Sequence, residues 1–174
     1  ITGNPVFQES DRASFFNHKA ETARPYYYQV YLADYDINTE IVPTERAAMF
    51  RFTFPENEKS AIVVDALDRG SAVTIIPSER KIIGYSTKNS GGVPSNFKNY
   101  FVIVFDKPFT YTAAVPNGDI RSSELEASGN HAGCIIGFAT KKGEVVHAKV
   151  ASSFISTEQA ELNLKELGTK SFEQ

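Results

Sequence analysis

The chain has no tryptophan, one methionine and a single cysteine among its 174 residues. One cysteine excludes an intrachain disulfide, and with it the class of small secreted folds that disulfides hold together. No apolar run approaches the length of about 20 residues that a membrane-spanning helix requires. Lysine and arginine do not cluster and the net charge is −3, so the concentrated basic surface that binds nucleic acid is also missing. We therefore expect no nucleic-acid partner and no membrane span.

The single cysteine, Cys134, lies in the apolar segment 132–137. A free cysteine in such surroundings is usually a small buried residue. A nucleophilic cysteine needs a histidine or carboxylate to activate it, and the segment contains neither. A packed core residue is therefore the favoured interpretation, and a catalytic thiol is the alternative.

Phenylalanine and tyrosine are abundant, with 13 and 8 residues respectively. Apolar and polar side chains alternate with period two at residues 26–32 and 48–54, and residues 37–42 can form a strand between them. Such alternation predicts strands that bury one face. Because similar segments and turn signals recur through residues 1–155, we predict a mainly β protein. Its fold class is an antiparallel, supersandwich-like β-sandwich of about ten or more strands with a short C-terminal helix.

Finer predictions concern the placement of single segments. Residues 61–65 and 100–105 are apolar on both faces, which is typical of strands in the middle of a sheet. The charged residues 56–59 predict a turn, and the polar residues 119–131 predict an exposed loop.

Residues 156–174 predict a helix that either covers a sheet or leads elsewhere. Ser156 can cap its start, with Gln159 completing a capping box. Glu161 and Lys165 are four residues apart and predict an ion pair on the helix surface. A glycine, Gly168, predicts the end of the helix.

Short motifs along the chain match those of one enzyme family. In the first third of the chain the matching residues are Phe16, Asn17, His18, Glu21, Ala23, Pro25, Tyr27, Tyr28, Glu40, Thr44, Arg46, Thr53, Phe54 and Pro55. Towards the end they are Ser153, Phe154, Ile155, Ser156, Glu158, Ala160 and Asn163. Tyr26, Pro43 and Ala48 depart from the family pattern. On these residues the chain resembles the N-terminal β-sandwich domain of glycoside hydrolase family 92.

That resemblance implies a function for the full-length protein. Members of this family are calcium-dependent, inverting exo-α-mannosidases, so we expect a secreted or periplasmic enzyme that trims mannose-containing glycans. In the family, the catalytic carboxylates and calcium-binding groups belong to a helical domain that follows the sandwich. The resemblance thus implies that the helix at residues 156–174 leads towards this absent domain, and that the chain is inactive alone and binds no calcium itself. Because the chain starts at Ile1 without a methionine or the apolar region of a signal peptide, we also expect a processed or cut piece. We assign no catalytic residue and no metal ligand within it.

The most informative polar cluster in the sequence combines His18 and Glu21. A histidine and a carboxylate three residues apart can orient a sugar hydroxyl or each other, whereas a lone histidine makes a poor metal site. The simpler interpretation is a hydrogen-bonded histidine on a loop that packs Phe15 and Phe16 into the core. We take His18, Glu21 and Tyr27 as candidates to face the substrate or a neighbouring domain.

Two other functions remain open. A stand-alone carbohydrate-binding sandwich would use Tyr26, Tyr27 or Tyr31 as a stacking platform for sugar rings. A purely structural or adhesive β-domain would have no affinity for sugar. Inverting hydrolysis itself needs a carboxylic acid and a carboxylate base about 6.5–9.5 Å apart. Nothing in the sequence identifies such a pair.

Overall fold

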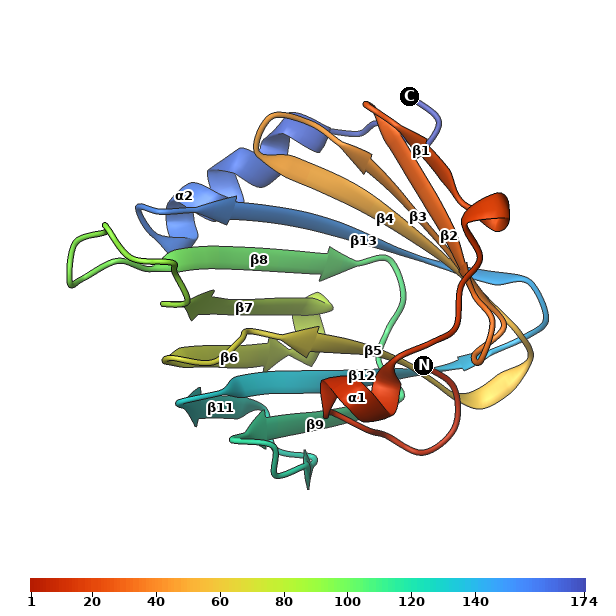
Figure 1. Cartoon of the computed structure of the whole chain (residues 1–174), viewed down its shortest axis with the longest axis horizontal. Helices are drawn as coiled ribbons and strands as arrows, with labels where there is room; N and C mark the ends of the chain where they lie inside the picture. Colours follow the sequence, from red (N-terminus) through yellow and green to blue (C-terminus); the bar gives the residue numbers. More distant parts are fainter.

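The computed structural model describes all 174 residues as two antiparallel β-sheets that pack face to face (Figure 1). The larger sheet runs in the order β1 (Thr22–Arg24), β2 (Tyr27–Leu32), β3 (Ile37–Pro43), β4 (Ala47–Phe54), β13 (Glu144–Ser153), β8 (Asn99–Phe105), β7 (Lys81–Ser86), β6 (Ser71–Ile76) and β11 (Glu126–Gly129). The smaller sheet runs in the order β10 (Arg121–Ser122), β9 (Tyr111–Pro116), β12 (Ala132–Thr140) and β5 (Asn57–Asp65). The predicted sandwich is confirmed.

The main core fills the space between the two sheets. The larger sheet contributes Phe54 and Phe105 to it, and β12 of the smaller sheet contributes Ile136 and Phe138. Strand β12 begins with seven consecutive buried residues because the core covers one face and the N-terminal segment covers the other. Cys134 lies in this run, and burial raises the pKa of its thiol to about 12. The interpretation of Cys134 as a core residue is therefore confirmed.

Two strands that are apolar on both faces occupy different positions. Strand β8 lies between β7 and β13, so the predicted central strand at residues 100–105 is confirmed. Strand β5 is the edge strand of the smaller sheet, so the predicted central position of residues 61–65 is wrong. Its second apolar face is covered instead by Phe7 and Ile1 of the N-terminal segment, which pack with Ala61.

Two segments that predict irregular structure contain strands. Strand β5 begins at Asn57, so the predicted turn at residues 56–59 is wrong over most of its length. Residues 119–131 contain the short strands β10 and β11, so the predicted loop is wrong there. Strands β10 and β11 are short and lie at sheet edges, where most of their side chains face solvent. Their sequences therefore show no alternation of apolar and polar residues.

The chain contains two α-helices, α1 (Glu9–Arg12) and α2 (Thr157–Leu164), and three 3₁₀ turns, η1 (His18–Ala20), η2 (Pro77–Glu79) and η3 (Lys165–Leu167). Helix α2 lies against β13 and β8 on the outer face of the larger sheet (Figure 1). Neither α-helix is long and apolar enough to cross a membrane.

The predicted start of α2 is confirmed, because the Ser156 hydroxyl accepts a hydrogen bond from the Gln159 backbone N–H at 3.2 Å. The predicted second half of the capping box is wrong, because the Gln159 side chain donates to Asn163 Oδ1 at 3.0 Å. The predicted ion pair within the helix is wrong. Glu161 pairs instead with Lys81 of β7, whose Nζ lies 3.1 Å from Glu161 Oε1. A partner from the neighbouring strand cannot be seen in the spacing of helix residues.

Candidate functional site

The candidate residues His18 and Glu21 meet at the turn η1, directly before β1. Asn17 caps the turn by accepting a hydrogen bond from the Lys19 backbone N–H at 2.9 Å. His18 Nδ1 lies 3.3 Å from Glu21 Oε2. The His18 side chain is 85% exposed, whereas that of Glu21 is only 19% exposed. The His18 imidazole is therefore exposed to solvent, and the Glu21 carboxylate beside it is partly buried.

The aromatic residues before this turn are not in the core. Phe15 is 69% exposed and Phe16 is 43% exposed. The ring of Phe16 lies edge-on to the His18 ring, with 5.1 Å between the centroids. The interpretation in which both phenylalanines pack inward is wrong. The turn instead carries an exposed surface of two aromatic rings and a histidine.

Tyr27 does not join this cluster. Glu21 neighbours Tyr28 of β2, where burial and then the Glu21 carboxylate raise the pKa of the Tyr28 hydroxyl. Successive residues of a strand point to opposite faces, so Tyr27 lies on the other side of the larger sheet. There its hydroxyl lies 2.7 Å from Glu40 Oε1 and 3.0 Å from Gln29 Oε1. The roles given to His18, Glu21 and Tyr27 remain predictions.

A polar row crosses this outer face of the larger sheet. Gln29, Glu40, Arg51 and His147 are paired in register on β2, β3, β4 and β13. Arg51 binds Glu40 with two hydrogen bonds, Nε to Oε2 and Nη2 to Oε1, each 2.7 Å long. Glu40 is 6% exposed and is the only buried charged residue. Glu40 and Arg51 occupy matching positions of the hairpin formed by β3 and β4, so the sequence alone could have indicated this pair.

Arg51 fixes the ionisation of Glu40. The hydrogen bonds from Arg51 lower the pKa of the Glu40 carboxyl, and their effect outweighs burial, which acts in the opposite direction. Burial and the contact with Glu40 raise the pKa of Tyr27. A general acid must carry a proton at the working pH, so a carboxyl with a lowered pKa is unsuited to that role. Glu40, the one buried carboxylate, therefore forms an ion pair with Arg51 that has a structural role.

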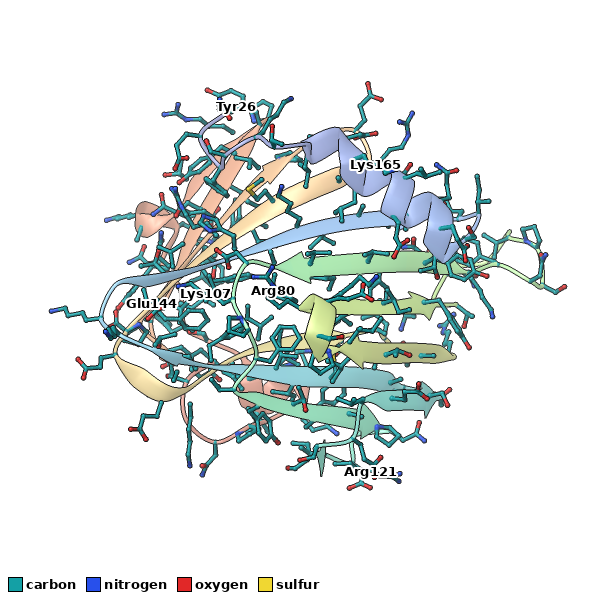
Figure 2. The ribbon with its side chains drawn as sticks, turned by 180° about the vertical axis from the view of Figure 1, so that it is seen from behind. Tyr26, Arg80, Lys107, Arg121, Glu144 and Lys165 are labelled. Atoms are coloured by element: carbon teal, nitrogen blue, oxygen red, sulfur yellow. The ribbon has the colours of Figure 1, made fainter.

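The C-terminal tail covers part of the polar row. The Arg51 guanidinium stacks 4.2 Å from the centroid of the Phe172 ring, and its Nη1 lies 2.6 Å from Glu173 Oε1. The tail also reaches the turn between β1 and β2, where Tyr26 and residues 170–174 line one depression of about 270 Å³. Figure 2 shows Tyr26 projecting outward at this corner of the molecule.

The exposed tyrosines do not form one stacking platform. Tyr26 is 64% exposed and precedes β2, whereas Tyr31 is 39% exposed near its other end. Five residues of extended chain separate the two by roughly 16 Å. Tyr27 lies between them with its hydroxyl engaged by Glu40.

No three histidine, cysteine, aspartate or glutamate side chains lie close enough together to hold a metal ion. The calcium ion that the family resemblance implies therefore finds no fitting set of these ligands in the chain.

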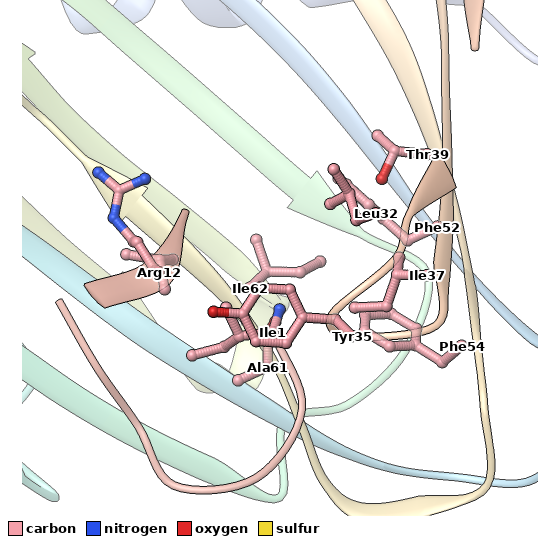
Figure 3. Close-up of a pocket in the computed structure, with 11 residues that line it drawn as sticks. Ile1, Arg12, Leu32, Tyr35, Ile37, Thr39, Phe52, Phe54, Ala61 and Ile62 are labelled. Atoms are coloured by element: carbon pink, nitrogen blue, oxygen red, sulfur yellow. The ribbon is translucent and has the colours of Figure 1, made fainter. Parts of the chain in front are cut away.

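A groove of about 220 Å³ opens between β5 of the smaller sheet and β2, β3 and β4 of the larger sheet (Figure 3). Nine of its eleven lining residues are hydrophobic, among them Leu32, Phe52 and Ile62. Its two polar residues are Arg12 and Thr39, and the buried Thr39 Oγ1 has no hydrogen-bond partner. Sugars need several polar groups at fixed positions, so this lining suits an apolar side chain better.

Comparison with known proteins identifies the family. Residues 1–153 match the glycosyl hydrolase family 92 N-terminal domain. A family 92 inverting mannosidase from Bacteroides thetaiotaomicron is 32% identical, with a TM-score of 0.92 over 98% of this chain and 23% of its own. A family 92 α-mannosidase from the same organism, solved with mannoimidazole, is also 32% identical, with a TM-score of 0.86 over 99% of this chain and 25% of its own. No curated protein matches.

The sequence match and the shared architecture together define the family of this chain. The chain is a two-sheet β-sandwich of the kind found at the N-terminal end of glycosyl hydrolases. It belongs to glycosyl hydrolase family 92, as its sequence motifs predict. It spans about a quarter of the length of the solved mannosidases that it matches.

Proposed function

We propose that the chain is the N-terminal sandwich of a longer exo-α-mannosidase, which supports the substrate pocket and does not itself catalyse hydrolysis. The observation that carries the proposal is the likeness to an inverting mannosidase, with a TM-score of 0.92 over 98% of this chain. The substrates would be mannose-containing glycans, and the enzyme would act outside the cytoplasm, in the periplasm or after secretion. Calcium would be held by residues outside this chain.

The side chains present support a non-catalytic role. In an inverting reaction one carboxylic acid protonates the leaving oxygen while a carboxylate activates water on the opposite face of the sugar. The buried carboxylate, Glu40, is held ionised by Arg51 and cannot supply that proton. On this proposal the catalytic acid and base come from the helical domain that the family resemblance implies.

The surface around η1 is our candidate for the wall of the pocket or the domain interface. Phe15, Phe16 and His18 are exposed there beside the partly buried Glu21. This turn directly precedes β1, the edge strand of the larger sheet (Figure 1). Exposed apolar rings beside polar groups are typical of surfaces that contact a sugar or another domain.

Proton NMR of an α-linked mannobiose tests the proposal. We expect no hydrolysis by the 174-residue chain, and release of mannose as the β-anomer by a longer polypeptide that contains it. Hydrolysis by the 174-residue chain alone would contradict the proposal, as would a longer polypeptide that folds, binds calcium and leaves the mannoside intact.

Substitution of His18 in the longer enzyme tests the role of the η1 surface. If this surface contacts substrate or the catalytic domain, His18→Ala lowers kcat/KM by roughly tenfold or more, which corresponds to about 1.4 kcal/mol of transition-state stabilisation. Glu124→Gln is the matched control, because Glu124 is exposed on the loop after β10, in the smaller sheet. Equal kcat/KM values for the two variants would exclude a role for His18.

A further inference from the structure

The outer edge of β5 has unpaired backbone groups. Strand β5 pairs with β12 on one side and has no strand of either sheet on the other. In an antiparallel strand alternate residues direct their N–H and C=O groups to opposite edges. Ala61 directs both of its groups outward, because its N–H donates to the Ile1 carbonyl and its carbonyl accepts from the Ile1 amino group, each at 2.8 Å. Val63, two residues on, therefore also directs its backbone groups outward.

The first residues of the chain already pair with this edge. Thr2 forms an antiparallel bridge with Ser60, and the Gly3 N–H donates to the Lys59 carbonyl at 3.1 Å. This register determines which residues of β5 would lie opposite any residues joined to the Ile1 amino group. The adjacent residue would lie opposite Ile62, and the next one would lie opposite Val63.

The groove between the sheets lies beside this register. The groove is lined by residues of β2, β3 and β4 on one side and of β5 on the other, so the smaller sheet leaves part of this inner face open beside β5. Ile62 packs against the main core and lines the groove. Residues directly opposite each other in a sheet point to the same face. The side chain next to Ile1 would therefore project towards Leu32 and Phe52 (Figure 3).

We propose that the outer edge of β5 and this groove bind an extended polypeptide segment, the residues joined directly to Ile1 in a longer family 92 chain. The segment adds a strand to the smaller sheet, exchanges two backbone hydrogen bonds with Val63 and places an apolar side chain in the groove. An exposed strand edge is a ready template for such pairing. The proposal rests on the proposed function, because it needs a longer polypeptide.

Two extended forms of the 174-residue chain test this inference. One carries Thr-Val directly before Ile1, and its control carries Thr-Asp. Both can form the same backbone bonds, but Asp would bring a charge into a groove with nine hydrophobic lining residues. The readout is hydrogen exchange of the Val63 amide by NMR, with the Ile62 amide, which faces β12, as an internal reference.

We expect the Thr-Val extension to slow exchange of the Val63 amide by roughly tenfold relative to the unextended chain, the effect of about one net hydrogen bond. The Thr-Asp form should exchange at the unextended rate. Equal Val63 rates in all three proteins would overturn the proposal. So would equal slowing by both extensions, because the groove would then select nothing. The experiment does not measure hydrolysis, so its failure is distinct from failure of the mannosidase proposal.

Discussion

Glu40 is a buried carboxylate on the outer face of β3, and Arg51 is its ion-pair partner. Removing one member of a buried pair leaves the other charge without compensation in a site that water hardly reaches. The sequence shows a glutamate and an arginine on two predicted strands, but not that the C-terminal tail covers them. Phe172 and Glu173 close over Arg51 from a distant part of the chain, which no local pattern encodes.

Arg51→Ala should lower the free energy of unfolding by about 3 kcal/mol, the typical cost of breaking a buried pair. Arg121→Ala is the matched control, because Arg121 is 48% exposed and pairs with surface carboxylates at the edge of the smaller sheet (Figure 2). We expect it to cost less than about 1 kcal/mol. Urea denaturation measures both. Adding Glu40→Gln to Arg51→Ala should recover stability, and similar losses for Arg51→Ala and Arg121→Ala would contradict this account.

At the scale of elements, the alternation of apolar and polar residues predicts where most strands lie in the sequence, but not their positions within the two sheets. The central position of β8 follows from its apolar residues on both faces, and the Ser156 cap follows from a local motif. Strand β5 has the same apolar character but lies at an edge, since Phe7 covers its outer face. Likewise, η1 brings His18 to Glu21 through local spacing, whereas the side of the sheet on which Tyr27 lies follows from the strand pairing.

The pairing of Ile1 with β5 makes stability depend on pH. Burial lowers the pKa of the Ile1 amino group from 8.0 to about 6, so between these values the unfolded chain binds a proton that the folded chain releases. Unfolding free energy should therefore rise between pH 6 and pH 8, by roughly 2 to 3 kcal/mol at most. Below about pH 6 both states are protonated, so stability no longer changes with pH through this group and the destabilising effect of burying the charged amine is complete.

Acetylation of the Ile1 amino group provides the control, because it removes this titration and leaves all other groups unchanged. Urea denaturation of both forms at pH 6, 7 and 8 should show the additional rise only for the free amine. Identical pH dependence in the two forms would contradict the burial of a charged amino group at this edge.

At the scale of the whole molecule, the sandwich is one quarter of the solved mannosidases that it resembles. Its fold and family follow from the sequence, because strand periodicity and short motifs are local properties. The catalytic residues do not follow from it, because the one buried carboxylate, Glu40, is held in an ion pair with Arg51. On our account the chemistry lies in the remainder of a longer polypeptide.

The intact mass of the protein isolated from its source tests this central claim most directly. If the chain is one domain of a longer mannosidase, the native product should be about four times the 19.2 kDa of this chain, close to 80 kDa, with peptides that continue beyond Gln174 into helix-rich sequence. A native product of 19.2 kDa would leave no polypeptide for a catalytic domain and would contradict the account.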